Sequence, residues 1–385
     1  MDIERLLGIL GDAQEIELEN VDILAEELEL VMRSAPRPRL PVPVGYRDLS
    51  FEKPLEEFRG GVSVVKFGNT AEEGGTRSHS VFVGGEKTMP FYRFEAENPY
   101  NPVVAFDVFD MPIGLAKPVK IHYQEVMEDP AEWARLCVNK YGADMVTIHL
   151  ISTDPTVKDT PISEAVKTVE EVLQAVKVPI IIGGSGNPDK DPEVLEKAAE
   201  AAEGERVMLN SASLNLDYKR VAKAAMDYGH VVLSWTQLDI NDQKTLNRHL
   251  FGMGVKKEDM LIDPTTAALG YGLEYSFSIM ERMRLSALKG DKDLQCPIAS
   301  GTTNAWGARE AWMKESPVEG ETWGDRMKRG PLWEAVSALS LALAGCDIFM
   351  MMCPTSVQLF KEMISQLCRD AEMHPASTWV TGVSP

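Results

Sequence analysis

Short apolar runs alternate with amphipathic segments along residues 103–385. The runs are VVAFDVF from Val103, MVTIHL from Met145, PIIIGG from Pro179, RVMLNSA from Arg206, HVVLSWT from His230, MLIDPTT from Met260, PIASGTT from Pro297 and DIFMMMCP from Asp347. Between them, SEAVKTVEEVLQAVK, DPEVLEKAAEAA and DYKRVAKAAMDYG carry apolar residues at helical spacing. Strands that are apolar throughout are typical of parallel sheets covered by helices on their faces.

Eight such units predict an α/β fold of the (β/α)8 TIM-barrel type over residues 103–385, because eight strand–helix repeats close most simply into a barrel. A doubly wound open sheet is the alternative. The count of eight runs and the lack of a GxGxxG motif after the first run favour the barrel.

The residues before the barrel are expected to form an N-terminal extension of helix and hairpin structure. Residues 1–44 comprise an acidic segment, which fits a helix as well as an alternating strand, and the linker PRPRLPVPV, whose prolines favour an extended chain. Residues 45–102 are expected to form a hairpin-rich segment that leads into or caps the barrel. It contains VSVVKFG and HSVFVGGEKTMPFYRFE, with Gly84–Gly85 as a turn signal.

Composition narrows the class of protein. The hydrophobic fraction of 44% and the charged fraction of 25% are those of a globular chain. No apolar stretch approaches the ~20 residues of a membrane helix, and the N-terminus lacks a signal-peptide pattern, so we expect a cytoplasmic protein without a membrane partner. The net charge of −20 argues against a nucleic-acid partner.

Cysteine and histidine spacing argues against a metal site. The five cysteines are scattered, without a Cys-x-x-Cys pair, and the six histidines form neither His-x-His nor His-Glu-x-x-His. The sequence therefore predicts no metal ligands and no iron–sulfur cluster held by this chain alone.

Small polar residues follow most of the apolar runs, where a barrel places its functional mouth. The candidate ligand-binding residues are Asp107, Ser185, Asn210, Ser211, Thr236, Asp263, Thr265, Gly301, Thr302, Thr303, Asn304 and Thr355. Such a ring of amides and hydroxyls suits a large heteroatom-rich ligand better than acid–base turnover, so no catalytic residue is predicted. The alternative for each position is helix capping. His149 is interpreted as a barrel histidine, and Cys353 as a small buried apolar residue.

Two runs carry a resemblance to a known group of barrels. LIDPTTAALGYGLEYSFSIMERM has an Asp263–Pro264 strand end and a glycine-containing loop, and VMLNSAS has Asn210 at a strand end. Both resemble pterin-binding barrels, the group of the dihydropteroate synthases and methyltetrahydrofolate methyltransferases. In that group the positions matching Asn210 and Asp263 hydrogen-bond the pterin. The Thr265–Thr266 and 301–304 stretches depart from the glycine- and basic-residue-rich loops of the synthases.

A wider resemblance covers nearly the whole chain. The acidic N-terminal segment, KFGNT, HSVFVGGEKTMPFYRFE, the apolar runs and LALAGCDIFMMMCPTSV together resemble the delta subunits of archaeal acetyl-CoA decarbonylase/synthase complexes. That family is related to the small subunit of the corrinoid iron–sulfur protein. The resemblance implies a heterodimer with a gamma subunit, which carries the four-cysteine cluster, and a corrinoid (cobamide) shared between the two over the barrel mouth.

The activity implied by this resemblance is methyl transfer from a methyltetrahydropterin, through the corrinoid, to the nickel site at which acetyl-CoA is made or cleaved. This chain would be a non-catalytic or co-catalytic subunit that also helps to hold the larger complex together. Two alternatives stay open: a stand-alone pterin-dependent methyltransferase, and an architectural barrel that contacts neither ligand.

A tryptophan-rich excursion is expected at about residues 304–335, between the last two strands. It contains Trp306, Trp312, Trp323 and Trp333, four of the seven tryptophans. Tryptophan favours interface centres, so the excursion is a candidate for contact with the partner or the corrinoid. The alternative is that the rings pack the excursion onto the barrel.

Overall fold

The chain is divided after Pro54 into two units, of which the second is Leu55–Pro385. The computed structural model describes residues 57–92, 98–267 and 269–368, all in the second unit. The acidic segment and linker predicted over residues 1–44 lie outside the described residues. Across the described ranges, no helix combines the length and the apolar character needed to cross a membrane.

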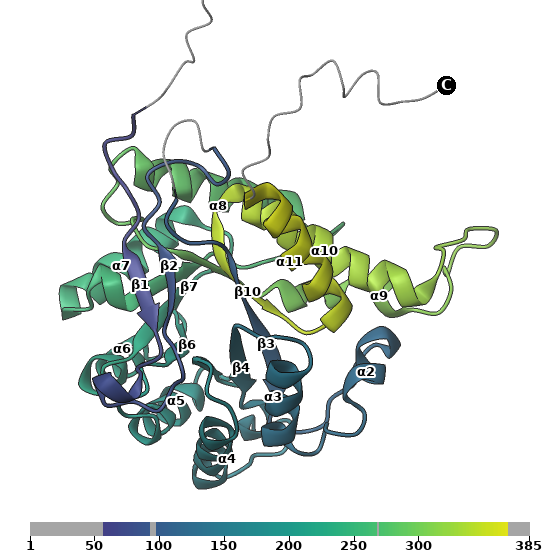
Figure 1. Cartoon of the computed structure of the whole chain (residues 1–385), viewed down its shortest axis with the longest axis horizontal. Helices are drawn as coiled ribbons and strands as arrows, with labels where there is room; N and C mark the ends of the chain where they lie inside the picture. Colours follow the sequence, from purple (N-terminus) through teal and green to yellow (C-terminus); the bar gives the residue numbers. More distant parts are fainter. Residues whose placement is uncertain (1–56, 93–97, 268, 369–385) are drawn as a thin grey trace, which may run out of the picture. The chain divides into compact units, whose positions relative to one another are not determined.

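Eight parallel strands close into a barrel in the order β10-β3-β4-β5-β6-β7-β8-β9 (Figure 1). Their bounds are β3 Val103–Phe109, β4 Met145–His149, β5 Ile180–Gly183, β6 Met208–Ala212, β7 Val231–Trp235, β8 Met260–Asp263, β9 Ile298–Ser300 and β10 Cys346–Met351. Each strand coincides with one of the eight apolar runs. The closed order confirms the (β/α)8 barrel and excludes the open doubly wound sheet.

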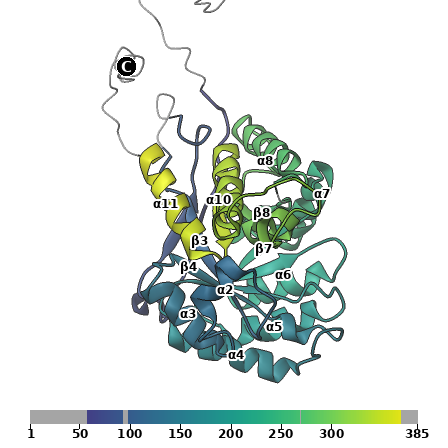
Figure 2. The same cartoon turned by 90° about the vertical axis from the view of Figure 1, so that its right-hand side faces the viewer.

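Helices surround the barrel and cover the outer faces of its strands (Figures 1 and 2). The α-helices are α2 Lys117–Tyr123, α3 Pro130–Asn139, α4 Ile162–Ala175, α5 Asp191–Ala201, α6 Tyr218–Asp227, α7 Ile240–Met253, α8 Leu273–Leu288, α9 Arg309–Trp312, α10 Arg326–Ala344 and α11 Pro354–Cys368. Short 3₁₀ helices are η2 Ala71–Glu73, η3 Ile151–Thr153, η4 Lys257–Asp259 and η5 Thr302–Gly307. The chain that links α9 to α10 projects away from the barrel (Figure 1).

Local sequence explains where several helices begin and which face they bury. Asp129, Asp217 and Asp239 precede α3, α6 and α7, and each side chain accepts a backbone N–H of the first turn. These carboxylates satisfy donors that would otherwise lack partners. In α4, Ala165 and Val169 belong to the buried face, as the three-to-four spacing predicts.

A two-stranded antiparallel hairpin precedes the barrel, formed by β1 (Val64–Phe67) and β2 (Val81–Gly84). Its side chains Val65, Phe67 and Val83 join the cluster inside the barrel. The linking segment binds backbone carbonyls just before the strands: Gly68 N–H donates to Arg206 O at 3.0 Å, and Ser78 N–H to Lys177 O at 2.8 Å. The hairpin therefore covers the N-terminal end of the barrel.

The glycine pair in this region has a different role from the predicted turn. Gly84 and Gly85 have φ of +86° and +82°, which side chains rarely adopt, and they end β2 instead of joining two paired strands. A Cβ on Gly84 would lie 2.0 Å from the carbonyl oxygen of Ser63. The connection between β1 and β2 is the longer segment 68–80.

Two buried arginines fasten the hairpin to the barrel. The Arg284 guanidinium lies 2.7 Å from a carboxylate oxygen of Glu86 and 2.6 Å from one of Asp347. Arg77 pairs with Glu205 at 2.7 Å and donates to Leu173 O at 2.8 Å. Buried ionic groups are tolerated when they are paired and hydrogen-bonded in this way.

Candidate functional site

Polar residues enter the barrel interior at the C-terminal ends of the strands. The inner apolar layer contains Ala105, Met145, Ile181, Met208, Leu261 and Ile348. Side chains alternate between the two faces of a strand, so positions two residues further along also point inward. These positions are Asp107, Thr147, Gly183, Asn210, Asp263 and Met350. The mouth therefore begins where this layer changes from apolar to mainly polar.

A cavity of about 320 Å³ opens at the mouth beside β4, β5, β6 and β7. Its lining consists mainly of glycines, amides and hydroxyls: His149, Gly183, Gly184, Gly186, Pro188, Asp191, Asn210, Ser211, Ser213, Asn215, Leu216, Trp235 and Gln237. Among the predicted ligand-binding residues, Asn210 and Ser211 are in this lining. Asn215 and Gln237 were missed because they lie in loops beyond the strand ends.

The loop after β5 is fixed by the carboxylate of Asp191, the first residue of α5. Its oxygens accept from Ser185 N–H at 2.9 Å, Ser185 Oγ at 2.8 Å and Gly186 N–H at 2.8 Å. A Cβ on Gly184 would lie 2.4 Å from the same carboxyl group, so only glycine fits there. The predicted residue Ser185 thus shapes the cavity rim, and its hydroxyl is engaged within the loop.

Asp107 and His149 form a pair at the floor of the mouth. Asp107 Oδ1 lies 3.0 Å from His149 Nε2, and Asp107 Oδ2 accepts a hydrogen bond from Thr303 Oγ1. The His149 ring stacks on Phe109 with centroids 5.0 Å apart, and its Nδ1 lies beside Gly183. The carboxylate thus lies beside one ring nitrogen, and the other ring nitrogen faces the cavity lining. This contact is compatible with the interpretation of His149 as a barrel histidine, which stays a prediction.

A second network joins β7 to β8. Asp263 accepts from Thr265 N–H at 2.8 Å, Thr265 Oγ1 donates to Thr236 O at 2.6 Å, and Thr236 Oγ1 bonds the side-chain oxygen of Gln243 at 2.9 Å. Burial raises the pKa of Asp263 to about 7, against the smaller opposing effect of the Thr265 N–H. Asp263 therefore holds a proton over part of the neutral pH range.

The remaining predicted residues surround the end of β9 and the start of α11. Thr302 Oγ1 lies 2.7 Å from Ser300 Oγ, and Asn304 Nδ2 donates to Thr266 O at 3.0 Å. Gly301 precedes η5, and Thr355 Oγ1 lies 3.1 Å from Cys353 Sγ. The Asn304–Thr266 hydrogen bond joins two neighbouring loops, whereas the contacts of Thr302 and Thr355 are local. Whether any of them also contacts a ligand stays a prediction.

The end of β10 is held by a residue that the sequence analysis missed. Glu334 on α10 is fully buried and accepts from Met352 N–H at 2.9 Å and Cys353 N–H at 3.2 Å. Burial raises the pKa of Glu334 to about 7 and also raises the pKa of the Cys353 thiol. Cys353 is accordingly a buried thiol with little thiolate character at neutral pH.

Three of the four tryptophans in the predicted excursion have contacts within this chain. Trp306 is buried, and a Cβ on Gly330 would lie 2.5 Å from its ring. Trp333 Nε1 donates to Leu269 O at 3.0 Å, and the Arg329 guanidinium lies 5.3 Å from the Trp323 ring centre. Trp312 is the most exposed of the four tryptophans, at 44%. The packing alternative thus accounts for three of the rings.

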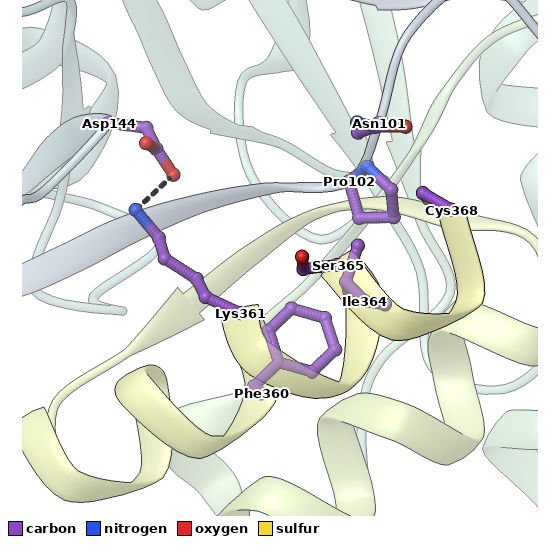
Figure 3. A pocket seen from close by; sticks show the side chains of 8 residues that line it. All are labelled: Asn101, Pro102, Asp144, Phe360, Lys361, Ile364, Ser365 and Cys368. Atoms are coloured by element: carbon purple, nitrogen blue, oxygen red, sulfur yellow. Dashed lines mark ion pairs between the residues drawn. The ribbon is translucent and has the colours of Figure 1, made fainter. Parts of the chain in front are cut away.

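A second cavity, of about 300 Å³, lies at the opposite end of the barrel (Figure 3). Asn101, Pro102 and Asp144 line it just before β3 and β4, and α11 supplies the other wall. The ammonium group of Lys361 lies 2.7 Å from a carboxylate oxygen of Asp144 and bridges the two sides. In (β/α)8 barrels this end serves stability, so the mouth remains the candidate functional site.

Comparison with known proteins identifies the family. The family model of the CO dehydrogenase/acetyl-CoA synthase delta subunit matches residues 64–319. The acetyl-CoA decarbonylase/synthase complex subunit delta of Archaeoglobus fulgidus is 58% identical over 330 residues, covering 85% of this chain and 73% of the relative. The protein of that name from Methanothermobacter thermautotrophicus is 51% identical over 390 residues, covering 98% and 97%.

The chain is also similar to solved structures. A dihydropteroate synthase from Xanthomonas albilineans has 16% sequence identity and a TM-score of 0.48, covering 70% of this chain and 94% of that chain. The family match spans most of the barrel, and the sequence relatives extend over most of the chain. The chain therefore belongs to the family of CO dehydrogenase/acetyl-CoA synthase delta subunits.

Proposed function

We propose that this chain acts as the delta subunit of an acetyl-CoA decarbonylase/synthase complex and binds a corrinoid at its barrel mouth together with a gamma subunit. The gamma subunit carries the iron–sulfur cluster in this proposal. The assembly passes a methyl group between a methyltetrahydropterin and the nickel site of the complex. The observation that carries the proposal is the cavity lined by amides and hydroxyls at the mouth.

The residues of the mouth fit the chemistry of a corrinoid. The rim of a corrin ring bears amide side chains, and the cavity offers complementary groups from Asn210, Asn215 and Gln237. A volume of about 320 Å³ is at the low end for ligand pockets and cannot enclose a whole corrin ring. It can receive one edge of the ring, so a second subunit has to cover the rest.

The chain's own residues would then bind and orient, without forming covalent bonds. When bound, the corrinoid supplies the cobalt that accepts and donates the methyl group. Asn210 and Ser211 are placed to hydrogen-bond ligand amides, and Gly183, Gly184 and Gly186 allow close approach to the backbone. Asp107 lies beside His149 at the cavity wall.

Anaerobic reconstitution tests this proposal. The full chain and the cluster-bearing gamma subunit are mixed with corrinoid and separated by size-exclusion chromatography, with corrinoid absorbance recorded. We expect a heterodimer that retains corrinoid better than either subunit alone. Asn210→Ala should reduce retention several-fold, whereas Asn241→Ala, an exposed amide on α7, should leave it unchanged. Corrinoid retained by the gamma subunit equally well without this chain would refute the proposal.

A second candidate is pterin binding by the barrel itself, as in a stand-alone methyltransferase. It is favoured by the buried Asp263, whose raised pKa leaves a carboxyl group that can donate a hydrogen bond near neutral pH. This candidate predicts methyltetrahydropterin binding by the isolated chain, measured by calorimetry, and its loss in Asp263→Ala. An isolated chain that shows no heat of binding excludes it.

A further inference from the structure

The part of helix α10 from Gly330 to Ala344 is mainly apolar, yet one face of it is exposed. Between Gly330 and Ala344 the only charged residue is Glu334, which is buried. On the opposite face, Leu332, Val336 and Leu343 are 50%, 43% and 45% exposed. A helix that is apolar on all sides is normally buried on all sides. The described residues therefore leave an apolar face of α10 uncovered.

The exposed face has the spacing of a helix-packing seam. Leu332, Val336, Leu339 and Leu343 follow one another at intervals of four, three and four residues. We call these four residues the outer seam. This interval pattern keeps apolar side chains on one line along a helix and is the pattern by which two helices pack together. The seam is about 16 Å long, at ~1.5 Å per residue.

Two exposed tyrosines lie at the start of α8, a helix that packs against α10. Tyr271 and Tyr275, at the start of α8, are 58% and 65% exposed. The hydrogen bond from Trp333 Nε1 to Leu269 O holds this part of the chain against the first turns of α10. Helix α11 also packs against α10, as Figures 1 and 2 show. Tyrosine is enriched in protein interfaces because its ring is apolar and its hydroxyl is polar.

We propose that the outer seam is the binding surface for an uncharged apolar face of a helix from another subunit of the complex. The seam runs along the outer wall of the barrel, so its partner would lie beside the barrel and not over the mouth cavity. This inference rests on the proposed membership in the complex, but it concerns a surface other than the corrinoid site.

Charge favours another subunit over a second copy of this chain. Two copies would each bring a net charge of −20, and this repulsion opposes self-association. The seam offers no charge for an ion pair, so the face that covers it has to be apolar and uncharged as well. Large uncharged apolar contacts are characteristic of permanent assemblies.

Single glutamate substitutions on two exposed helix positions test the proposal. Val336→Glu places a charge in the seam, and Met226→Glu places one on α6 at a similar exposure, 39% against 43%. Each full-length variant is mixed with the purified remaining subunits of the complex, and assembly is followed by light scattering and native mass spectrometry. We expect Val336→Glu to associate at least about tenfold more weakly, and Met226→Glu to behave as the wild type.

Three further readouts separate the possible outcomes. Circular dichroism should show that both variants fold, and Leu343→Glu should repeat the effect of Val336→Glu. Corrinoid retention in the heterodimer with gamma should stay unchanged in Val336→Glu, whereas Asn210→Ala should lose corrinoid and keep the lateral assembly. Normal assembly of both seam variants would overturn the proposal. Dimerisation of the isolated chain through the seam would also overturn the proposal. Protection of the seam from hydrogen exchange in the isolated chain would overturn it as well.

Discussion

Asp107 and His149 lie on different strands, and their side chains meet at 3.0 Å. Asp107 was predicted at the mouth and His149 was interpreted as a barrel histidine, but their contact was not predicted because the register between β3 and β4 was not known. In that register Phe109 is opposite His149 and Asp107 is opposite Thr147. The hydroxyls of Thr302 and Thr265 were also predicted at the mouth. Thr302 bonds Ser300 at the end of β9, and Thr265 donates to the carbonyl of Thr236 after β7. Strand ends can be predicted from the sequence, but hydrogen-bond partners across loops cannot.

The raised pKa of Asp263 predicts a pH-dependent stability. The native state keeps a proton that the unfolded state releases above about pH 4, so stability falls as pH rises from about 4 to 7 and then levels off. Asp263→Asn removes this dependence and keeps an oxygen to accept the Thr265 N–H. Relative to the wild type, the variant should gain up to about 4 kcal/mol between pH 4 and pH 7.5.

Urea unfolding at several pH values measures this difference. Glu334, whose pKa is also raised, contributes the same slope to both proteins and cancels in the comparison. Stability curves that run parallel for the wild type and Asp263→Asn would show that Asp263 is ionised in the folded protein over this whole range.

At the scale of elements, the sequence predicts the eight strands well because each is an uninterrupted apolar run buried on both faces. The hairpin β1–β2 was predicted to lead into or cap the barrel, but the end of the barrel that it covers was not predicted. That position depends on contacts such as Arg284 with Glu86 and Arg77 with Glu205, which join residues far apart in the sequence. A local pattern contains no information about them.

The ion pairs of Arg284 predict a large effect of one substitution. Arg284→Met leaves the carboxylates of Glu86 and Asp347 buried without a cation, and should cost about 3–5 kcal/mol of stability. Arg248→Met removes an ion pair with Asp293 whose arginine is 60% exposed, and should cost at most about 1 kcal/mol.

Guanidinium unfolding of the two variants provides the measurement. If Arg284→Met does not fold, the triple variant Glu86→Gln/Arg284→Met/Asp347→Asn should recover a cooperative transition, because it removes the unpaired charges together with the arginine. Equal losses in Arg284→Met and Arg248→Met would contradict the assigned role of the buried network.

The loop after β5 predicts a local effect at the mouth. Asp191→Ala removes three hydrogen bonds to Ser185 and Gly186, and should destabilise the protein by about 1–3 kcal/mol. Hydrogen exchange of residues 184–190 should become faster. Glu193→Ala, an exposed position on the same helix, is the control and should change neither quantity. Unchanged exchange in Asp191→Ala would mean that the loop is held by other contacts.

At the scale of the whole molecule, the barrel could be predicted because strand number and alternation fix its topology. The depth of burial of individual side chains was harder to predict. All five cysteines lie within the described residues, and Cys137, Cys296, Cys346 and Cys353 are buried while Cys368 is partly exposed. Burial raises the pKa of the Cys296 thiol to about 12. The closed fold thus protects four thiols that are scattered along the sequence.

This protection predicts the number of reactive thiols. Ellman's reagent should label one thiol rapidly in the native protein and five in guanidinium, because the thiolate is the reactive species and four thiols are buried. Cys368→Ser should abolish the rapid phase, and Cys353→Ser should leave it intact. Rapid labelling of a second thiol in the native protein would indicate that the barrel opens more readily than its packing implies.

The hairpin beneath the barrel also bears on the order of events in catalysis. With the N-terminal end covered, a ligand in the mouth cavity enters and leaves by the C-terminal face. Under the proposed function, the methyl donor and the methyl acceptor have to approach through that same face. The methyl donor and the methyl acceptor then cannot be bound at the same time, which predicts ping-pong kinetics. The turnover rate should be limited by the exchange of these two partners at the single opening.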